Sequence, residues 1–155
     1  MAFKMLAVAG VAVFLAFVSE QAASQGAGAG GLNQVCLGCI CEAASGCNTT
    51  IGCVGDICGP FHITWGYWSD SGKPTLNGQP ASDNNAYANC VNDAYCAARA
   101  VQGYMEKYSQ DCNNDGTINC DDYARIHYLG GYGCGGALEK RYENAYYNCR
   151  NSFAQ

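Results

Sequence analysis

Hydrophobic residues recur every three or four positions in several stretches of the chain, which is the period expected of an amphipathic helix. Residues 94–108 show this period most clearly. The apolar positions on one side of this predicted helix are Ala97, Val101, Tyr104, Met105 and Tyr108. Further helices are predicted over residues 34–42, 82–92, 121–129 and 137–149. Ser82 is the expected N-cap of the second of these.

Turn-forming residues cluster between the predicted helices. Residues 48–59 are rich in glycine and are predicted to form a small hairpin. A short element that begins at Trp65 ends at the turn 71–74, and the polar residues 75–85 are predicted to form a surface loop. We therefore expect a single α+β domain that is mostly helical and carries a small antiparallel sheet.

The first 24 residues have the layout of a secretory signal peptide. Lys4 is followed by an uncharged apolar run and then by small residues at 22–24. The apolar run is shorter than the roughly 20 residues that span a bilayer, which disfavours the alternative of a retained anchor. Residues 25–31 are mainly glycine and alanine and are expected to be a flexible tail, so the folded domain is 32–155. We expect a secreted, extracellular protein with no membrane association after signal removal.

All twelve cysteines follow the predicted signal peptide. A dense, even set of cysteines in an exported chain predicts disulfides. Zinc binding is the alternative, but only His62 and His127 could add nitrogen ligands, and no two CxxC pairs have zinc-finger spacing. Disulfides would also stabilise a domain of this size, whose core alone contributes little.

The net charge of −5 and the pI of about 4.7 argue against a nucleic-acid partner, which requires a basic face. The acidity fits a digestive or lumenal setting, but solubility explains it equally well. Charge therefore excludes one class of partner and selects no other.

Several motifs keep a common register along the chain. They are CLGCIC at 36–41, SGC at 45–47, CGPF at 58–61, WGYW at 65–68, Cys90, Cys96, VQGYM at 101–105 and YARIH at 123–127. This pattern resembles the invertebrate-type, destabilase-like lysozymes over about residues 32–149. The resemblance implies a disulfide-rich lysozyme-like fold, hydrolysis of the β-1,4 link between N-acetylmuramic acid and N-acetylglucosamine, and no required cofactor. It also implies a monomer whose partner is peptidoglycan or a chitin-like oligosaccharide.

The resemblance also implies a set of disulfides, although the sequence by itself does not choose among the possible pairings. The short bridges implied are Cys41–Cys47, Cys53–Cys58 and Cys90–Cys96. The long-range bridges suggested are Cys36–Cys120 and Cys39–Cys149, which leaves Cys112–Cys134.

Glycosidases of this kind need one protonated and one ionised carboxyl group. In the family the proton donor is a glutamate immediately before the Ser-Gly-Cys motif, and here that residue is Ala44. Asp56 matches the family nucleophile. The chain therefore most resembles insect members that lack the catalytic glutamate. Because general acid catalysis is worth about 10²–10⁴ in rate, we expect weak or absent muramidase activity.

Two other residues are candidates for catalysis. Glu42 could replace the missing acid, but it lies two helix positions before Ala44, about 200° around the axis, and is expected to face elsewhere. Some family members are isopeptidases, and His127 is the only histidine at a family-like position. The serine expected after Asp56 is missing, so we interpret His127 as a groove-lining histidine without a catalytic task.

Aromatic residues beside the hairpin are candidates for substrate binding. Trp65, Tyr67 and Trp68 could stack on sugar rings, and His62 lies next to them in the chain. They could equally belong to the core, because large aromatics dominate the cores of small domains. Trp68 and Phe61 are the more plausible core pair.

Residues 111–122 have the spacing of a calcium-binding loop, with glycine at the sharp turn. The predicted ligands are Asp111, Asn113, Asp115, Thr117 through its carbonyl, and Asp122. Cys112 and Cys120 lie inside the loop, and a simple turn between helices that needs no ion is the alternative.

Asn48-Thr49-Thr50 is an N-glycosylation sequon between the Ala44 and Asp56 segments, where a glycan could crowd the cleft. Three functions remain open from the sequence. They are a weak muramidase, a non-catalytic peptidoglycan-binding immune or digestive protein, and a calcium-stabilised interaction module.

Overall fold

The computed structural model describes residues 31–154. The predicted signal peptide 1–24, and all but the last residue of the predicted tail 25–31, lie outside the described residues. The elements are α1 (Gln34–Ser45), β1 (Cys53–Val54), β2 (Ile57–Cys58), β3 (Ile63–Thr64), α2 (Trp65–Asp70), α3 (Ala86–Asn92), α4 (Ala94–Tyr108), α5 (Cys120–Leu129) and α6 (Lys140–Ser152). Within residues 31–154, no helix is long and apolar enough to cross a membrane.

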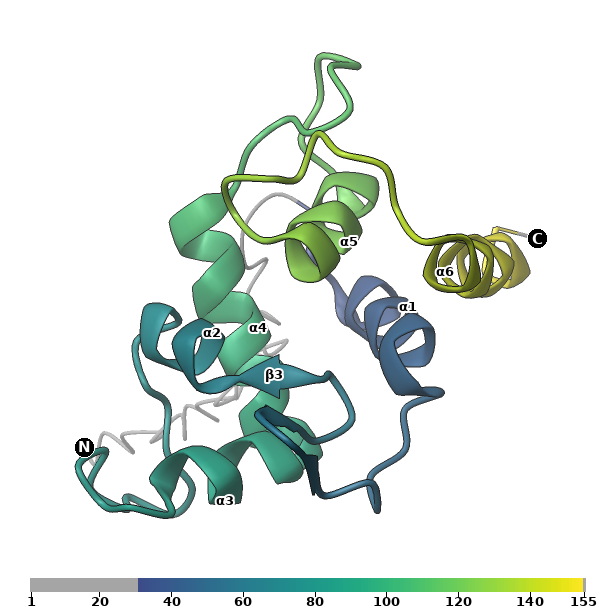
Figure 1. The fold of residues 1–155 in the computed structure, drawn as a ribbon. Helices are drawn as coiled ribbons and strands as arrows, with labels where there is room; N and C mark the ends of the chain where they lie inside the picture. Colours follow the sequence, from purple (N-terminus) through teal and green to yellow (C-terminus); the bar gives the residue numbers. More distant parts are fainter. Residues whose placement is uncertain (1–30, 155) are drawn as a thin grey trace, which may run out of the picture.

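Helix α1 lies between α6 on one side and the α4–α5 pair on the other (Figure 1). It begins at Asn33, whose side chain accepts a hydrogen bond from the N–H of Cys36, and ends at Gly46, which adopts a left-handed conformation. It therefore runs three residues beyond the predicted end at residue 42. The helix predicted over 94–108 is confirmed as α4.

Two predicted helix starts are wrong. Ser82 is not an N-cap, because residues 81–85 form turns and α3 begins only at Ala86. The last helix begins at Lys140 and not at residue 137, because the carboxylate of Glu139 accepts the N–H groups that start α6. Helix ends are less well defined by hydrophobic periodicity than the helices themselves.

The predicted hairpin is confirmed and carries a third strand. β1 pairs antiparallel with β2, and β2 pairs antiparallel with β3. A two-residue turn joins β1 to β2, and its first residue, Gly55, has a φ of 63°, which a glycine adopts without strain. This turn carries Asp56 at its second position.

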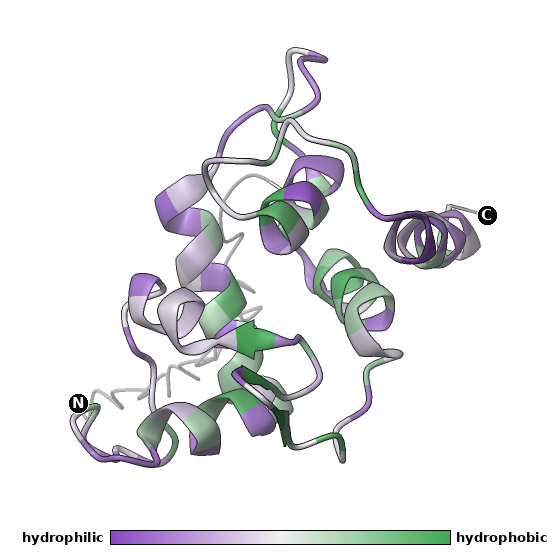
Figure 2. Cartoon of the chain, viewed as in Figure 1, coloured by the Kyte–Doolittle hydropathy of each residue, from purple (hydrophilic) through white to green (hydrophobic). Residues whose placement is uncertain are grey.

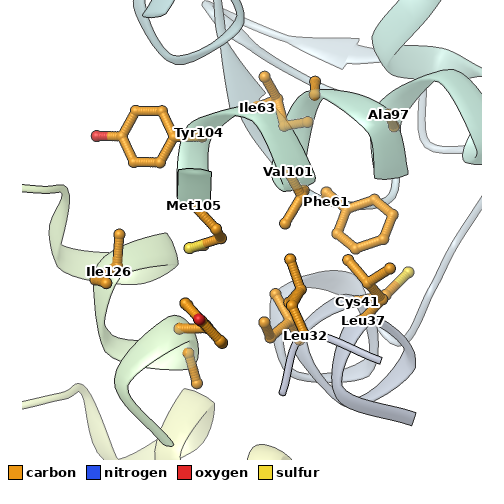
Figure 3. Close-up of a cluster of buried hydrophobic side chains, with 14 of the residues drawn as sticks. Leu32, Leu37, Cys41, Phe61, Ile63, Ala97, Val101, Tyr104, Met105 and Ile126 are labelled. Atoms are coloured by element: carbon orange, nitrogen blue, oxygen red, sulfur yellow. The ribbon is translucent and has the colours of Figure 1, made fainter. Parts of the chain in front are cut away.

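The core forms where α1 and α4 face each other. Figure 3 shows Val101 of α4 on the side that faces α1, Met105 of α4 near Ile126 of α5, and Phe61 near Leu37 of α1. Gly103 on another side of α4 has no room for a Cβ, because the carbonyl oxygen of Ser71 would overlap it. The close contact between α2 and α4 therefore requires glycine at this position.

Helix α6 is hydrophilic over most of its surface, whereas α1 is largely hydrophobic (Figure 2). Two buried tyrosines, Tyr142 and Tyr146, nevertheless pack α6 against the rest of the domain. The hydroxyl of Tyr142 donates a hydrogen bond to the carbonyl of Ala124 at 3.0 Å. These aromatic contacts and one disulfide hold a helix that its own composition would leave in solvent.

All six disulfides implied by the family resemblance are present, and no cysteine is free. They are Cys36–Cys120, Cys39–Cys149, Cys41–Cys47, Cys53–Cys58, Cys90–Cys96 and Cys112–Cys134. The first two close loops of 84 and 110 residues and join α1 to α5 and α6. On the loop-entropy model each such bridge stabilises the fold by about 4–5 kcal/mol. The predicted class, a disulfide-rich and mostly helical domain with a small antiparallel sheet, is confirmed.

Candidate functional site

A pocket of about 410 Å³ opens where α1, α2, α5 and α6 converge beside the sheet. Its walls include Ala44 of α1, Tyr67 of α2, His127 of α5 and Arg141 of α6. The segment that joins β2 to β3 adds His62. Residues that are distant in the sequence therefore share one concave surface, which is typical of a ligand site.

A chain of hydrogen bonds crosses the floor of this pocket. Nε2 of His127 lies 2.8 Å from the carbonyl oxygen of Phe61, and Nδ1 lies 2.9 Å from the hydroxyl of Tyr67. A carbonyl only accepts, so Nε2 carries the proton and Nδ1 accepts the hydrogen bond that Tyr67 donates. The geometry thus selects one neutral tautomer of His127.

The environment of the His127 side chain keeps the imidazole neutral. The pKa of His127 is lowered to about 4, mainly by burial and less by the nearby His62, while the hydrogen bond to Phe61 opposes the shift. The ring of Tyr67 stacks on Tyr104 with centroids 3.7 Å apart. Burial also raises the pKa of Tyr67 well above its usual range. His127 and Tyr67 are therefore both uncharged at the floor of the pocket.

Neither candidate acid lies in the pocket. Ala44 lines it and is 6% exposed, whereas Glu42 is exposed and lines a separate groove of about 770 Å³ between α1 and α6. Asp56 is exposed at the hairpin turn, where its backbone carbonyl accepts a hydrogen bond from the hydroxyl of Tyr87. No aspartate or glutamate lines the pocket, and Arg141 is the one residue among its walls that carries a permanent charge.

The three aromatic candidates are placed differently. Trp68 is 1% exposed and donates its indole N–H to the carbonyl of Pro74, so it belongs to the core with Phe61. Tyr67 contributes to the pocket floor. Trp65 is 57% exposed and borders a second hollow of about 310 Å³, with the ammonium of Lys73 5.5 Å from its ring centroid.

His62 and Arg141 both line the pocket, His62 from the segment between β2 and β3 and Arg141 from α6. His62 has a φ of 53°, an unusual conformation that costs about 1–3 kcal/mol for a residue other than glycine. Burial lowers the pKa of His62, and the positive charge of Arg141 lowers it further.

The predicted calcium loop forms a turn held by its own hydrogen bonds. Asp122 is fully buried, and its carboxylate accepts from the N–H groups of Cys112 at 2.8 Å and Asn119 at 2.9 Å. Within residues 31–154, no three His, Cys, Asp or Glu side chains are grouped to hold a metal ion. The ligands predicted for calcium were Asp111, Asn113, Asp115, Thr117 and Asp122. Calcium binding is not supported, because Asp122 is instead part of the capping box of α5.

Asn48 lies on the exposed loop between α1 and β1. Its side-chain oxygen accepts hydrogen bonds from the N–H of Thr50 at 3.0 Å and from the hydroxyl of Thr50 at 2.8 Å. The sequon is thus folded into a local turn in which the asparagine side chain faces solvent.

Sequence reasoning missed two groups in the pocket. Arg141 carries no motif, and its place in the pocket depends on the docking of α6, which the disulfide Cys39–Cys149 joins to α1 and whose buried tyrosines contact α5. Tyr104 was predicted as part of the apolar side of a helix, which is correct, but its stacking on Tyr67 has no sequence signal.

Comparisons with known proteins agree with this fold. The Destabilase family matches residues 33–149. The lysozyme of Magallana gigas is 39% identical over 109 residues, which cover 66% of this chain and 69% of that protein. Invertebrate-type lysozyme 3 of Caenorhabditis elegans is 35% identical over 118 residues, which cover 74% of this chain and 84% of that protein.

A solved structure is also similar. It is the crystal structure of Aeromonas hydrophila PliI in complex with Meretrix lusoria lysozyme, matched with a TM-score of 0.61 and 34% identity over 77% of this chain and 93% of the matched chain. Fold and sequence agree over the same region. The chain therefore belongs to the Destabilase family, with invertebrate-type lysozymes among its relatives.

Proposed function

We propose that this protein is exported and binds the glycan strands of bacterial peptidoglycan in the pocket between α1, α5 and α6, with little or no hydrolysis. The observation that carries the proposal is the lining of that pocket. Ala44 occupies the position that the family resemblance assigns to the proton donor, and no carboxylate is present among the walls. The pocket is thus present with alanine at the position of the proton donor.

The chemistry of glycoside hydrolysis supports a large loss of rate. The leaving oxygen needs a proton from a positioned acid, and the developing sugar cation needs a carboxylate beside it. Ala44 offers no proton, and Asp56 is exposed on the hairpin turn. A missing general acid typically lowers the rate by about 10²–10⁴.

Aromatic groups support glycan binding. Trp65 is largely exposed beside a separate hollow, and an exposed indole can stack on the C–H face of a pyranose. Tyr67 and His62 line the pocket itself. The names of the relatives, all lysozymes, favour peptidoglycan as the glycan. An immune or digestive role is compatible with this binding.

The alternatives receive less support. An isopeptidase would need a nucleophile beside His127, but both ring nitrogens of that histidine are occupied by Tyr67 and the Phe61 carbonyl. The hydroxyl of Thr64 lines the pocket, but it caps α2 by accepting the N–H of Tyr67. A calcium-stabilised interaction module lacks a formed ion site in the described residues.

The proposal is tested by measuring sedimentation with insoluble peptidoglycan and the clearing of bacterial cell-wall suspensions between pH 4 and 8. We expect the protein to sediment with the walls and to clear them at least about 100-fold more slowly than a lytic relative. Clearing at the rate of that relative, or a failure to sediment, would refute the proposal.

Two variants measure how much of the loss is due to the missing proton donor. Ala44→Glu places a carboxyl group on the pocket wall, and Ala44→Gln is the matched control of the same size without an acid. We expect Ala44→Glu to clear walls faster than Ala44→Gln at a pH near the pKa of the new acid. Equal rates for two folded variants that bind walls would mean that the position of Asp56 also limits the reaction.

A further inference from the structure

The hollow of about 310 Å³ that Trp65 borders is separate from the pocket described above. The two share no lining residue. Trp65 and Trp68 of α2 form one side of the hollow, the loop residues 81–84 close it, and Tyr87 of α3 adds a third aromatic ring. The lining of this hollow indicates which kind of ligand would fit.

The three aromatic rings follow one another along the wall. Trp65 and Trp68 have ring centroids 6.4 Å apart and planes inclined at 56°. Trp68 and Tyr87 have centroids 5.8 Å apart and the same inclination. Trp68 is held in place by the hydrogen bond from its indole N–H to the carbonyl of Pro74, whereas Trp65 is exposed. Inclined rings around a hollow can bind an organic cation, because the faces of aromatic rings carry a negative potential.

The charged side chains of the lining also favour a cation. Asp83 is the one acidic residue among the lining residues, and Lys73 is the one basic residue. None of the ion pairs found within residues 31–154 includes Asp83. Its carboxylate accepts a hydrogen bond from the neutral amide of Gln79 at 3.4 Å. This exposed carboxylate is therefore available to a positively charged ligand.

Lys73 already places a cation at this wall. Its ammonium nitrogen lies 5.5 Å from the ring centroid of Trp65, within the range of a cation–π contact. Such a contact is weak at an exposed site, so a ligand can displace it. The ammonium of lysine is strongly hydrated. A quaternary ammonium, which is less hydrated, should therefore compete well with Lys73 for the aromatic face.

We infer that the hollow binds a trimethylammonium group, such as that of choline, against Trp65 and Tyr87 and beside Asp83, in place of Lys73. The space suffices, because a cavity of about 150 Å³ holds benzene, which is similar in size. A trimethylammonium group has no N–H donor, so aromatic faces and one carboxylate can supply all of its contacts. The inference goes beyond the proposed function, since the ligand is not a glycan and the hollow is not the glycan pocket.

Trp65 provides the measurement. The chain has two tryptophans, and Trp68 is only 1% exposed, so a ligand in the hollow should change mainly the fluorescence of Trp65. Choline is compared at pH 7 with 3,3-dimethylbutan-1-ol, which has the same shape without the charge, and with ethanolamine, a primary ammonium. We expect choline to bind in the millimolar range and at least about fivefold more tightly than either. Equal affinity for choline and the neutral alcohol would overturn the inference.

Variants test the role of each group. Lys73→Gln removes the competing ammonium and should tighten choline binding about threefold, whereas Asp83→Asn should weaken it about threefold. Lys140→Gln is the matched control, because it removes the same charge from α6 outside the hollow, and it should leave the affinity within about 1.5-fold of the wild-type value. In Trp65→Leu, calorimetry should show that the preference for choline over the neutral alcohol is lost.

The outcomes separate this inference from the proposed function. If choline does not bind to a wild-type protein that sediments with peptidoglycan, the inference alone fails. Weaker choline binding in Lys73→Gln than in Lys140→Gln would also overturn it, since Lys73 would then assist the ligand and not compete with it.

Sedimentation with vesicles of phosphatidylcholine identifies the source of the trimethylammonium group. If the protein binds choline and sediments with the vesicles, the ligand is a lipid headgroup. If it binds choline and stays in the supernatant, the ligand is a soluble choline compound.

Discussion

The hydroxyl of Tyr67 lies 2.9 Å from Nδ1 of His127, although 60 residues separate the two in the chain. The hydrogen bond joins α2 to α5 at the floor of the pocket. Because the other ring nitrogen donates to the carbonyl of Phe61, the imidazole is held from both sides in its neutral form. A proton added to Nδ1 would face the tyrosine hydroxyl in a site with little access to water.

The stability of the protein should therefore fall as the pH is lowered. The pKa of His127 is about 4 in the folded state, against an ordinary value of 6.5. Above pH 6.5 the imidazole is neutral in both states, and its stabilising contribution is complete. Between pH 6.5 and about 4 the unfolded chain takes up a proton that the folded protein does not. The free energy of unfolding should thus decrease by up to about 3 kcal/mol.

Guanidinium denaturation at pH 7 and pH 4, with the disulfides intact, measures this decrease. His127→Gln is the control, because its amide can donate to Phe61 and accept from Tyr67 but does not titrate. The decrease should be smaller in this variant, with a remainder from His62, whose pKa is lowered in the same direction. An equal decrease in both proteins would contradict the assignment.

Trp65 should contribute to glycan binding through its exposed face. We expect Trp65→Ala to weaken sedimentation with insoluble peptidoglycan about five- to tenfold, because aromatic contacts are worth about 0.5–1.5 kcal/mol beyond their area. Tyr95→Ala is the control, since Tyr95 is an aromatic residue that is 87% exposed and lines no pocket described above. Equal effects of the two substitutions would remove Trp65 from the binding surface.

Asp122 should be essential for stability and not for ion binding. Asp122→Asn replaces a carboxylate oxygen by an NH₂ group that faces the N–H donors of Cys112 or Asn119. We expect a loss of about 1–3 kcal/mol in the free energy of unfolding. Asp83→Asn, at an exposed carboxylate, should change it by less than about 0.5 kcal/mol. A melting temperature of the wild-type protein that rises on addition of calcium would contradict this account.

Asn48 should carry an N-linked glycan when the full chain is expressed in eukaryotic secretory cells. The side-chain amide of Asn48 is exposed, and its oxygen accepts a hydrogen bond from the hydroxyl of Thr50. In the transfer, Nδ2 attacks the anomeric carbon of a lipid-pyrophosphate-linked oligosaccharide, and the lipid pyrophosphate and one amide proton are released. Glycosidase treatment should increase gel mobility of the wild-type protein and of Thr49→Ala. Asn48→Gln and Thr50→Ala should not shift, and a shift that persists in them would place the glycan elsewhere.

Local patterns predicted much of the fold. The period of α4 is visible in the sequence because its buried side follows a regular helical spacing, and glycine at position 55 marks the hairpin turn. The disulfide pairing followed from the family resemblance. Cap positions were less predictable. The start of α6 depends on how one carboxylate, that of Glu139, accepts two N–H groups, and glutamate is not among the preferred N-cap residues.

The sequence by itself determined that position 44, which the family resemblance assigns to the proton donor, is alanine, and that the cysteines suffice for six bridges. Only the tertiary structure decided which groups surround that alanine. His127, Tyr67 and Arg141 come from three helices, and their meeting depends on long-range disulfides and on buried packing. Such contacts join positions far apart in the chain, so no local pattern encodes them, and the charge of the pocket is a property of the folded molecule alone.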